Sequence, residues 1–323
     1  MILVTGATGK IGGEVARLLA ASGTPVRAFV RSPRKAAGLA GLGVELAPGD
    51  LADTGSLAVA MDGIERLFLV CAQDLRQAEL QGNAVTAAAA AGVRHVVKVS
   101  GIGPSLSLGG PAEVGRQHWQ TEQQIERSGM AFTFLRPNFF MQNLLETAAP
   151  MVSKLSVLAA PMDNAPIAMV DARDVAAAGA AALTSDAHYD RVYDVTGPRA
   201  FTYRQLAGVL SNATHRTISY VNPPPALAAR VLRRQGYEDW YVEHLAAMTA
   251  LFRAGAGATV STAVADVTGR QPRSIEDFTT EFASQFSQNP APPPVQTAAR
   301  LGLGLASRTA ATASRLAGLR RSR

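Results

Sequence analysis

Apolar residues along the chain gather into short runs that alternate with longer segments in which apolar positions recur with a helical period. Short apolar runs rich in β-branched residues are typical of buried strands, and the helical period is typical of amphipathic helices. The pattern predicts strands at residues 2–5, 26–30, 44–47, 66–70, 95–100 and 131–135, and helices at residues 10–21, 77–91 and 115–127. Regular alternation of the two predicts an α/β protein with a Rossmann-type, doubly wound parallel sheet.

Two stretches interrupt this rhythm with short helices and prolines, at residues 137–165 and 197–262. We expect them to form a smaller substrate lobe within an NAD(P)-binding body that spans residues 1–286. The proline-rich sequence at residues 289–294 then marks a boundary. Residues 287–323, rich in small side chains and arginine, indicate either a disordered tail or a segment that binds an anionic membrane surface or an acidic partner.

The net charge of +6 comes from this tail. Six of the 31 Lys and Arg residues lie in residues 287–323, which contain no acid, so the remaining 25 balance the 25 Asp and Glu of the body. A neutral body without a basic stripe argues against nucleic-acid binding. The single cysteine, Cys71, permits no intramolecular disulfide and favours a reducing, cytoplasmic location. Because the first predicted strand follows Met1 directly and no apolar run suits a membrane helix, we expect a soluble protein without a signal peptide.

The first predicted strand leads into the sequence T-G-A-T-G-K-I-G-G, which precedes a predicted helix. Gly6, Gly9 and Gly12 have the spacing of a dinucleotide-binding loop. The first glycine permits a tight turn, the second lets the backbone approach a pyrophosphate, and the third lets the helix pack closely on the strand. The N-terminus of the helix then faces the phosphates. The position of the loop therefore predicts a nicotinamide dinucleotide rather than a merely structural turn.

Cations follow the second predicted strand, where an enzyme selective for NAD would carry an acidic residue. The sequence there reads V-R-S-P-R-K, with Arg31 and Lys35 and no acid. These residues either bind the 2′-phosphate of NADP(H) or form a solvated basic loop, and we predict NADP(H) as the preferred cofactor, with NAD(H) as the second choice. Asp50, after the third predicted strand, either binds the adenine amine or caps a turn.

The sequence R-Q-H-W-Q-T-E-Q-Q-I-E, residues 116–126, takes the place of the catalytic Tyr-x-x-x-Lys of a short-chain dehydrogenase but contains neither residue. All six tyrosines lie at or beyond Tyr189, and none has a lysine four residues later. His118 and Glu122 share one helix face, and they either orient water or substrate or form a solvated pair. We expect no tyrosine-type acid in this stretch.

Other polar pairs are expected to be structural. Asp174 precedes V-A-A-A-G and is predicted to be a helix N-cap, so that Asp171 and Asp174 form no metal site. Thr202 with Gln205, and Ser274 with Asp277, are predicted capping boxes. His95, His188, His215 and His244 show no metal-ligand spacing, and no metal is expected.

Six motifs together resemble the NmrA-like atypical short-chain dehydrogenases. In chain order they are T-G-A-T-G-K-I-G, V-R-S-P-R-K-A, L-R-P-N-F-F-M-Q-N, V-D-A-R-D-V-A, Y-D-V-T-G-P and T-G-R-Q-P-R-S-I-E-D-F. The resemblance extends to about residue 286 and leaves out the tail. It implies either an NAD(P)H-dependent reductase of quinone-like or electron-poor aromatic compounds, or a non-catalytic redox sensor, because the family contains both.

Transferred by position, the family pattern and the glycine spacing imply two sets of binding residues. The cofactor set is Gly6, Thr8, Gly9, Lys10, Ile11, Gly12, Arg31, Lys35, Asp50, Leu51, Val70, Cys71 and Ala72, and the substrate set is Asn138, Phe139, Phe140, Met141 and Asn143. The aromatic and Met residues of the second set are otherwise plain core. Ser100 resembles the serine that the wider family keeps near the nicotinamide, or it is a strand-end hydroxyl bonded to backbone. Ser100 and His118 are therefore the catalytic candidates.

Overall fold

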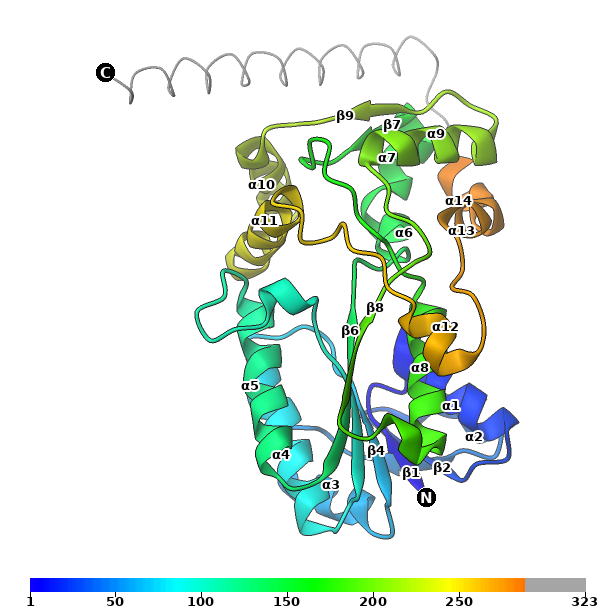
Figure 1. Ribbon diagram of the computed structural model, residues 1–323, viewed down its shortest axis with the longest axis vertical. Helices are drawn as coiled ribbons and strands as arrows, with labels where there is room; N and C mark the ends of the chain where they lie inside the picture. The colour runs from blue at the N-terminus through cyan, green and yellow to red at the C-terminus, as the bar shows by residue number, and fades with distance from the viewer. Residues whose placement is uncertain (288–323) are drawn as a thin grey trace. The chain divides into compact units, whose positions relative to one another are not determined.

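A computed structural model of the 323-residue chain describes residues 1–287 (Figure 1). The predicted linker and tail lie outside the described residues, apart from Ser287, which ends helix α14 (Ala283–Ser287). The described chain forms two compact units. The first contains Met1–Asn138, Val170–Pro198 and Ser261–Pro272, and the second contains Phe139–Met169, Arg199–Val260 and the residues from Arg273 onward.

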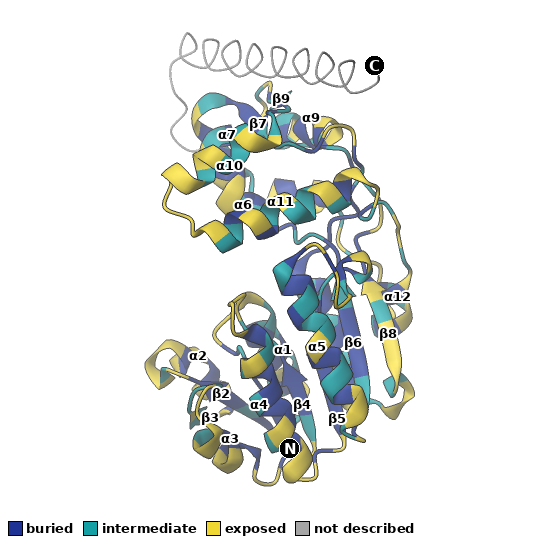
Figure 2. Ribbon diagram, turned by 90° about the vertical axis from the view of Figure 1, so that its left-hand side faces the viewer, coloured by how far each residue is buried: buried dark blue, intermediate teal, exposed yellow. Residues whose placement is uncertain are grey.

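The first unit is built on a seven-stranded sheet with the order β3-β2-β1-β4-β5-β6-β8, in which all neighbouring strands are parallel. The strands are β1 (Ile2–Val4), β2 (Val26–Val30), β3 (Glu45–Pro48), β4 (Arg66–Leu69), β5 (His95–Val99), β6 (Ala131–Pro137) and β8 (Arg191–Val195). The predicted α/β class and Rossmann-type sheet are confirmed. Six of the strands were predicted, whereas the exposed edge strand β8 was not (Figure 2).

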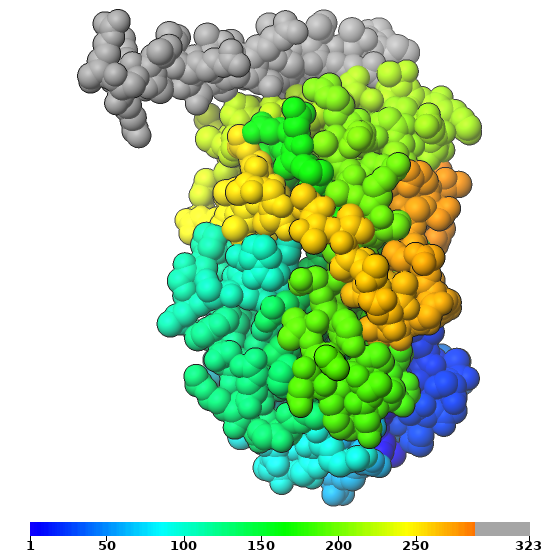
Figure 3. Space-filling model, viewed as in Figure 1, coloured from blue at the N-terminus to red at the C-terminus, as the bar shows by residue number. Residues whose placement is uncertain are grey.

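Helices cover both faces of this sheet (Figure 1). On one face α3 (Thr54–Met61), α4 (Gln77–Ala90) and α5 (Glu113–Arg127) pack in a row. On the other face α1 (Lys10–Ala21) packs against α8 (Ala172–Thr184), and α12 (Ala263–Thr268) lies beside α8 and β8 (Figure 3). Short turns of helix, η1 (Pro33–Ala36), α2 (Ala37–Ala40), η2 (Gly103–Ser105) and η3 (Asp186–His188), occupy connections.

The core beneath α3, α4 and α5 explains why these segments are helical. Leu57, Ala60 and Met61 of α3 recur at helical spacing and are buried against strand residues such as Leu67. Burial of such a stripe stabilises a helix more than its intrinsic propensity does. The sheet and its helices thus form a rigid base beneath the loops at the carboxyl ends of the strands.

The second unit consists mainly of helices. They are α6 (Asn143–Thr147), α7 (Ala149–Leu155), α9 (Tyr203–Thr214), α10 (Pro225–Arg234), α11 (Asp239–Arg253), α13 (Ile275–Glu281) and α14. A parallel pair of short strands, β7 (Val157–Ala159) and β9 (Ser219–Val221), accompanies them. The capping box of Thr202 and Gln205 at α9 is confirmed, and Ser274 caps α13. None of the helices within residues 1–287 is long and apolar enough to cross a membrane.

Helix α8 begins earlier than predicted. Its N-cap is Asp171, whose side chain accepts a hydrogen bond from the Arg173 N–H at 2.8 Å, so the assignment of Asp174 as the N-cap is wrong. Asp174 lies in the first turn, where its charge still favours the positive end of the helix dipole. Asp171 also forms an ion pair with the Arg173 side chain at 2.7 Å, which the spacing of the two aspartates did not indicate.

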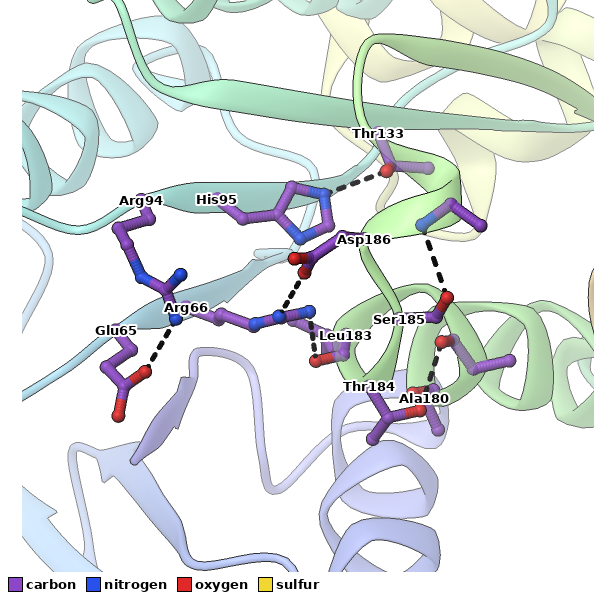
Figure 4. Close-up of polar contacts among 12 residues, drawn as sticks. Glu65, Arg66, Arg94, His95, Thr133, Ala180, Leu183, Thr184, Ser185 and Asp186 are labelled. Carbon is purple, nitrogen blue, oxygen red and sulfur yellow. Dashed lines mark hydrogen bonds and ion pairs between the residues drawn. The ribbon is translucent and has the colours of Figure 1, made fainter.

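Polar side chains hold the amino ends of β4 and β5 to the segment after α8 (Figure 4). Arg66 of β4 forms an ion pair with Asp186. His95 Nε2 lies 2.9 Å from Thr133 Oγ1, and because that hydroxyl donates to the His188 carbonyl at 2.6 Å, His95 Nε2 must be the donor. Burial lowers the pKa of this neutral imidazole to about 4. His95 therefore has a structural role at the edge opposite the expected crevice.

Candidate functional site

The carboxyl ends of β1 and β4 lie side by side where the strand order reverses. Thr5 joins the two loops that follow these strands. Its Oγ1 donates to the Val70 carbonyl at 2.8 Å and accepts from the Val70 N–H at 2.9 Å. Ligands of doubly wound sheets bind at this reversal, so the two loops mark the expected cofactor crevice.

The glycine loop at this point is shaped to hold a phosphate group. Gly6 has a φ of 58°, and a Cβ added there would lie 2.8 Å from the Val70 carbonyl oxygen. A Cβ on Gly12 would lie 2.5 Å from the Gly6 carbonyl oxygen, so neither position admits a side chain. Gly9 is the N-cap of α1 and supplies no side-chain cap, which leaves the first N–H groups of the helix without that partner. This exposed helix N-terminus fits the pyrophosphate of a dinucleotide.

The remaining cofactor residues lie on loops at the same edge of the sheet. Thr8 and Lys10 are exposed beside Gly9, and Ile11 is half-buried in the first turn of α1. Arg31 follows β2 and is exposed, as is Lys35 on η1. Both cations lie one strand away from the glycine loop, because β2 pairs with β1. Their binding to a 2′-phosphate stays a prediction.

Asp50 and the loop after β4 have local hydrogen bonds of their own. Asp50 Oδ1 accepts from the Ala52 N–H at 2.9 Å, which is the turn-capping alternative, although it leaves the second carboxylate oxygen for adenine. Leu51 is half-buried and Ala72 is exposed. Cys71 Sγ accepts from Gln81 Nε2 at 3.1 Å, and burial raises the pKa of the Cys71 thiol. Cys71 is therefore a neutral thiol beside the loop.

Ser100 directly follows β5 at this edge. Its N–H donates to the Leu135 carbonyl at 2.7 Å, and the residue is 5% exposed. Its Oγ has no hydrogen-bond partner within the described part of the chain, so the hydroxyl does not satisfy backbone as the structural alternative required. An unpaired buried hydroxyl is costly unless a ligand or water meets it. The orphaned Oγ thus fits a residue that contacts a bound ligand.

Lys98, which no sequence motif indicated, lies within the strand sequence H-V-V-K-V. Its side chain is 0% exposed, and Nζ lies 2.9 Å from His118 Nδ1 and 3.0 Å from the Val99 carbonyl oxygen. Burial lowers the pKa of Lys98 to about 8, although Glu122 opposes the shift. A central strand covered on both faces is expected to hold apolar residues. A lysine within the predicted strand was therefore the sequence feature that could have indicated a functional residue.

His118 and Glu122 of α5 take different partners. His118 is half-buried, and its Cδ2 lies so close to Gly101 that a Cβ there would come within 3.2 Å. Glu122 is 2% exposed and forms an ion pair with Arg136 of β6 at 2.6 Å. The alternative of a solvated His118–Glu122 pair is therefore wrong, because Glu122 is buried against the sheet, whereas a role of the two side chains in orienting water or substrate stays a prediction. Glu122 instead joins α5 to β6 and so helps to fix the position of His118 on that helix.

The predicted substrate residues follow β6. Asn138 ends the first unit, with its N–H bonded to the Val195 carbonyl at 2.9 Å. In the second unit, Phe139 packs edge-on against Phe252, with ring centroids 6.1 Å apart. Phe140 and Asn143 are half-buried, whereas Met141 is 1% exposed and packs as core. A separate open cavity of about 670 Å³ in this unit is lined by residues of α9 and α13 and by none of these.

Comparisons with known proteins agree on one group. The profile of the NmrA-like family matches residues 1–279. The NAD(P)H azoreductase of Xenophilus azovorans is 36% identical over 286 residues, which cover 88% of this chain and 99% of that protein. The (4-alkanoyl-5-oxo-2,5-dihydrofuran-3-yl)methyl phosphate reductase of Streptomyces griseus is 38% identical over 290 residues, covering 89% of this chain and 99% of that protein. The crystal structure of an NADPH-dependent quinone oxidoreductase from Escherichia coli with NADPH superposes with a TM-score of 0.80 and 28% identity, covering 87% of this chain and 99% of that chain.

Proposed function

The chain belongs to the NmrA-like family, and we propose that it transfers hydride from NADPH to a quinone-like or electron-poor aromatic acceptor. The general activity in this proposal, NAD(P)H-dependent oxidoreduction, is supported by the named activities of the azoreductase and the quinone oxidoreductase. The observation that carries the proposal is the glycine cradle, in which Gly6 and Gly12 exclude side chains beside an uncapped helix N-terminus. A bound nicotinamide dinucleotide supplies hydride to such an acceptor.

The cofactor residues favour the phosphorylated dinucleotide. Arg31 and Lys35 are exposed cations at the carboxyl end of β2, and no acidic residue stands between Arg31 and Val44. An arginine can grip a phosphate through two parallel hydrogen bonds. NADPH is therefore the proposed hydride source, with NADH as the weaker alternative.

The chemistry that the relatives share supports the proposed acceptor class. An azo bond, a quinone and an unsaturated lactone conjugated to a carbonyl are all electron-poor π systems, and these are the groups that the relatives' names contain. In this chain, Phe139 and Phe140 with the flanking Asn138 and Asn143 are the proposed substrate contacts, since aromatic walls suit flat apolar ligands.

NADPH oxidation, followed with and without oxygen, tests the proposal. The acceptors are menadione, methyl red, a cationic triphenylmethane dye and cyclohexenone. We expect turnover of at least one aromatic acceptor. A protein that binds NADPH but oxidises it with none of them would be a dinucleotide sensor, and the enzymatic proposal would fail.

A matched pair of glycine variants tests the cradle itself. Gly12→Ala should abolish NADPH binding measured by calorimetry, because its Cβ would lie 2.5 Å from the Gly6 carbonyl oxygen. Gly208→Ala serves as the control, since this exposed helical glycine has nothing within 4 Å of an added Cβ. Undiminished NADPH binding by a folded Gly12→Ala protein would show that the loop holds no cofactor.

A further inference from the structure

A buried lysine contacts the catalytic candidate His118 inside the first unit. We propose that Lys98 and His118 form a proton relay that protonates the reduced acceptor, an inference that rests on the proposed function. The proposal stands on the 2.9 Å contact between Lys98 Nζ and His118 Nδ1, at the end of β5 that carries Ser100. Lys98 has no side-chain exposure, whereas His118 is half-buried.

Lys98 occupies a position where an apolar residue would stabilise the fold more. It lies in a central strand, paired with β4 through Leu69 and with β6 through Phe134. Taking an ammonium group out of water costs free energy unless partners compensate. Strongly perturbed groups of this kind gather at functional sites. The partners that Lys98 has, the Val99 carbonyl and His118, connect it to the edge where the orphaned Ser100 hydroxyl lies.

The contact determines which proton His118 can give. An ammonium group has no acceptor, so Lys98 Nζ must donate and His118 Nδ1 must accept. The single proton of the neutral imidazole is then on Nε2. The Gln77 amide nitrogen of α4 lies 3.0 Å from Nδ1 and 3.3 Å from Nε2, so it faces the edge of the ring between the two nitrogens.

Proton transfer through this pair leaves no charged imidazole. When hydride adds to one nitrogen of an azo bond, the N–N π bond breaks and the second nitrogen holds the electron pair. The His118 Nε2–H bond then breaks as the proton forms a bond to that nitrogen. A proton moves at the same time from Lys98 Nζ to His118 Nδ1, so that histidine ends as its other neutral tautomer and lysine as a neutral amine. Without Lys98, the same step would leave an imidazole anion, which makes neutral histidine a poor acid.

The relay matters only for acceptors that become strong bases. A quinone becomes a phenolate of pKa about 10, which solvent protonates readily. Hydride addition to an azo bond leaves a much more basic nitrogen anion, and hydride addition to an enone leaves an enolate. A general acid accelerates such steps by about 100-fold or more. We therefore expect Lys98 to act as a positioning and proton-supplying residue for azo or enone reduction and to be dispensable for quinones.

The charges around Lys98 set the pH range of the relay. Burial lowers the pKa of Lys98 to about 8, Glu122 of α5 and Cys71 after β4 raise it, and Arg136 of β6 lowers it. Lys98 must be protonated to supply the proton. Relay-dependent rates are therefore expected below about pH 8 and should fall as the pH rises through that value.

Acceptor choice provides the first test. At saturating NADPH, Lys98→Met should lower kcat for methyl red, or for cyclohexenone, by about 100-fold or more and lower kcat for menadione by less than about tenfold. The alkaline fall of the methyl red rate should disappear in this variant. Lys154→Met, at an exposed lysine of α7, is the matched control and should change neither rate. Equal losses for all acceptors, or no loss for any, would overturn the relay, as would a wild-type protein that reduces menadione but neither other acceptor.

A second measurement needs no turnover. In the free protein labelled with ¹⁵N-histidine, the His118 resonances should show the Nε2–H tautomer throughout about pH 6 to 8, and His118→Gln assigns them. Wild-type spectra with the proton on Nδ1 would overturn the relay whatever the enzyme reduces. If the wild type oxidises NADPH with no acceptor while the spectra agree, the proposed function fails, and the relay falls with it because no acceptor remains to be protonated.

Discussion

Replacing Lys98 by methionine should make the protein more stable. Methionine keeps the length of the side chain and removes its charge. The pKa of Lys98 falls from 10.5 in water to about 8 in the fold. Each pKa unit corresponds to about 1.4 kcal/mol, so keeping the buried ammonium charged costs about 3 kcal/mol at neutral pH. Loss of the donor to His118 Nδ1 offsets about 1 kcal/mol of this, and we expect a net gain of about 2 kcal/mol for Lys98→Met.

The sign of the pH dependence follows from the same shift. Between about pH 8 and 10.5 the unfolded chain holds the Lys98 proton and the folded protein does not, so the contribution of Lys98 to stability rises with pH in that window. Urea unfolding of wild type and Lys98→Met, at about pH 7 and about pH 9.5, measures the difference. The advantage of the variant should shrink by about 2 kcal/mol at the higher pH, because Lys98 is by then mostly neutral in the fold.

Lys154→Met controls for loss of an exposed charge and should leave the free energy of unfolding within about 0.5 kcal/mol of wild type. A Lys98→Met protein that is less stable than wild type at neutral pH, by an amount that does not vary with pH, would contradict the reasoning. Lys98 would then be a structural residue whose hydrogen bonds outweigh its desolvation.

Three further outcomes are expected. Arg31→Ala should remove most of the preference for NADPH over NADH in calorimetry, a loss of about 10- to 100-fold, since charge-assisted hydrogen bonds contribute about 1.5–3 kcal/mol. Arg234→Ala, the control, should keep the preference. Equal wild-type affinities for both cofactors would refute the 2′-phosphate assignment. His118→Ala should keep at least about a tenth of the menadione rate, and a collapse of several hundredfold with unchanged cofactor binding would make His118 the acid for every acceptor. Between about pH 7 and pH 5, urea unfolding should show that wild type loses about 2 kcal/mol more stability than His95→Gln. The reason is that His95 binds a proton near pH 6.5 in the unfolded chain but only near pH 4 in the folded protein. Stability curves that stay parallel for the two proteins would refute this.

The central strands of the sheet were predictable because both of their faces are covered. Residues 26–30, V-R-A-F-V, and residues 66–69, R-L-F-L, are apolar apart from one arginine each, and the structure has strands there. The edge strand β8 was not predicted because its sequence, R-V-Y-D-V, contains two charged residues and its first two residues are exposed. No continuous apolar run therefore indicates a strand there. This segment is a strand because its backbone pairs with β6, a contact that the local sequence does not reveal.

The site could be predicted where a residue's role depends on local geometry. The glycine loop is such a case, since turn, close approach and helix start all lie within a few residues. The Lys98–His118 contact joins residues 20 positions apart in the chain, and only the packing of α5 on the sheet creates it. For Glu122 the local spacing was misleading. Helical spacing placed Glu122 beside His118, but its partner in the structure is Arg136, 14 residues later.

The first unit recruits its last helix from near the end of the described chain, which affects how the protein is made. Ser261 N–H bonds to Thr196 Oγ1 at 2.9 Å, and α12 covers α8 and β8 with the buried Val264 and Val267. A chain emerging from the ribosome must therefore be synthesised beyond Val267 before this surface closes. Until then α8 and the edge of the sheet remain open to aggregation or chaperones, and a messenger truncated upstream of Ser261 yields an unfinished domain rather than a smaller one.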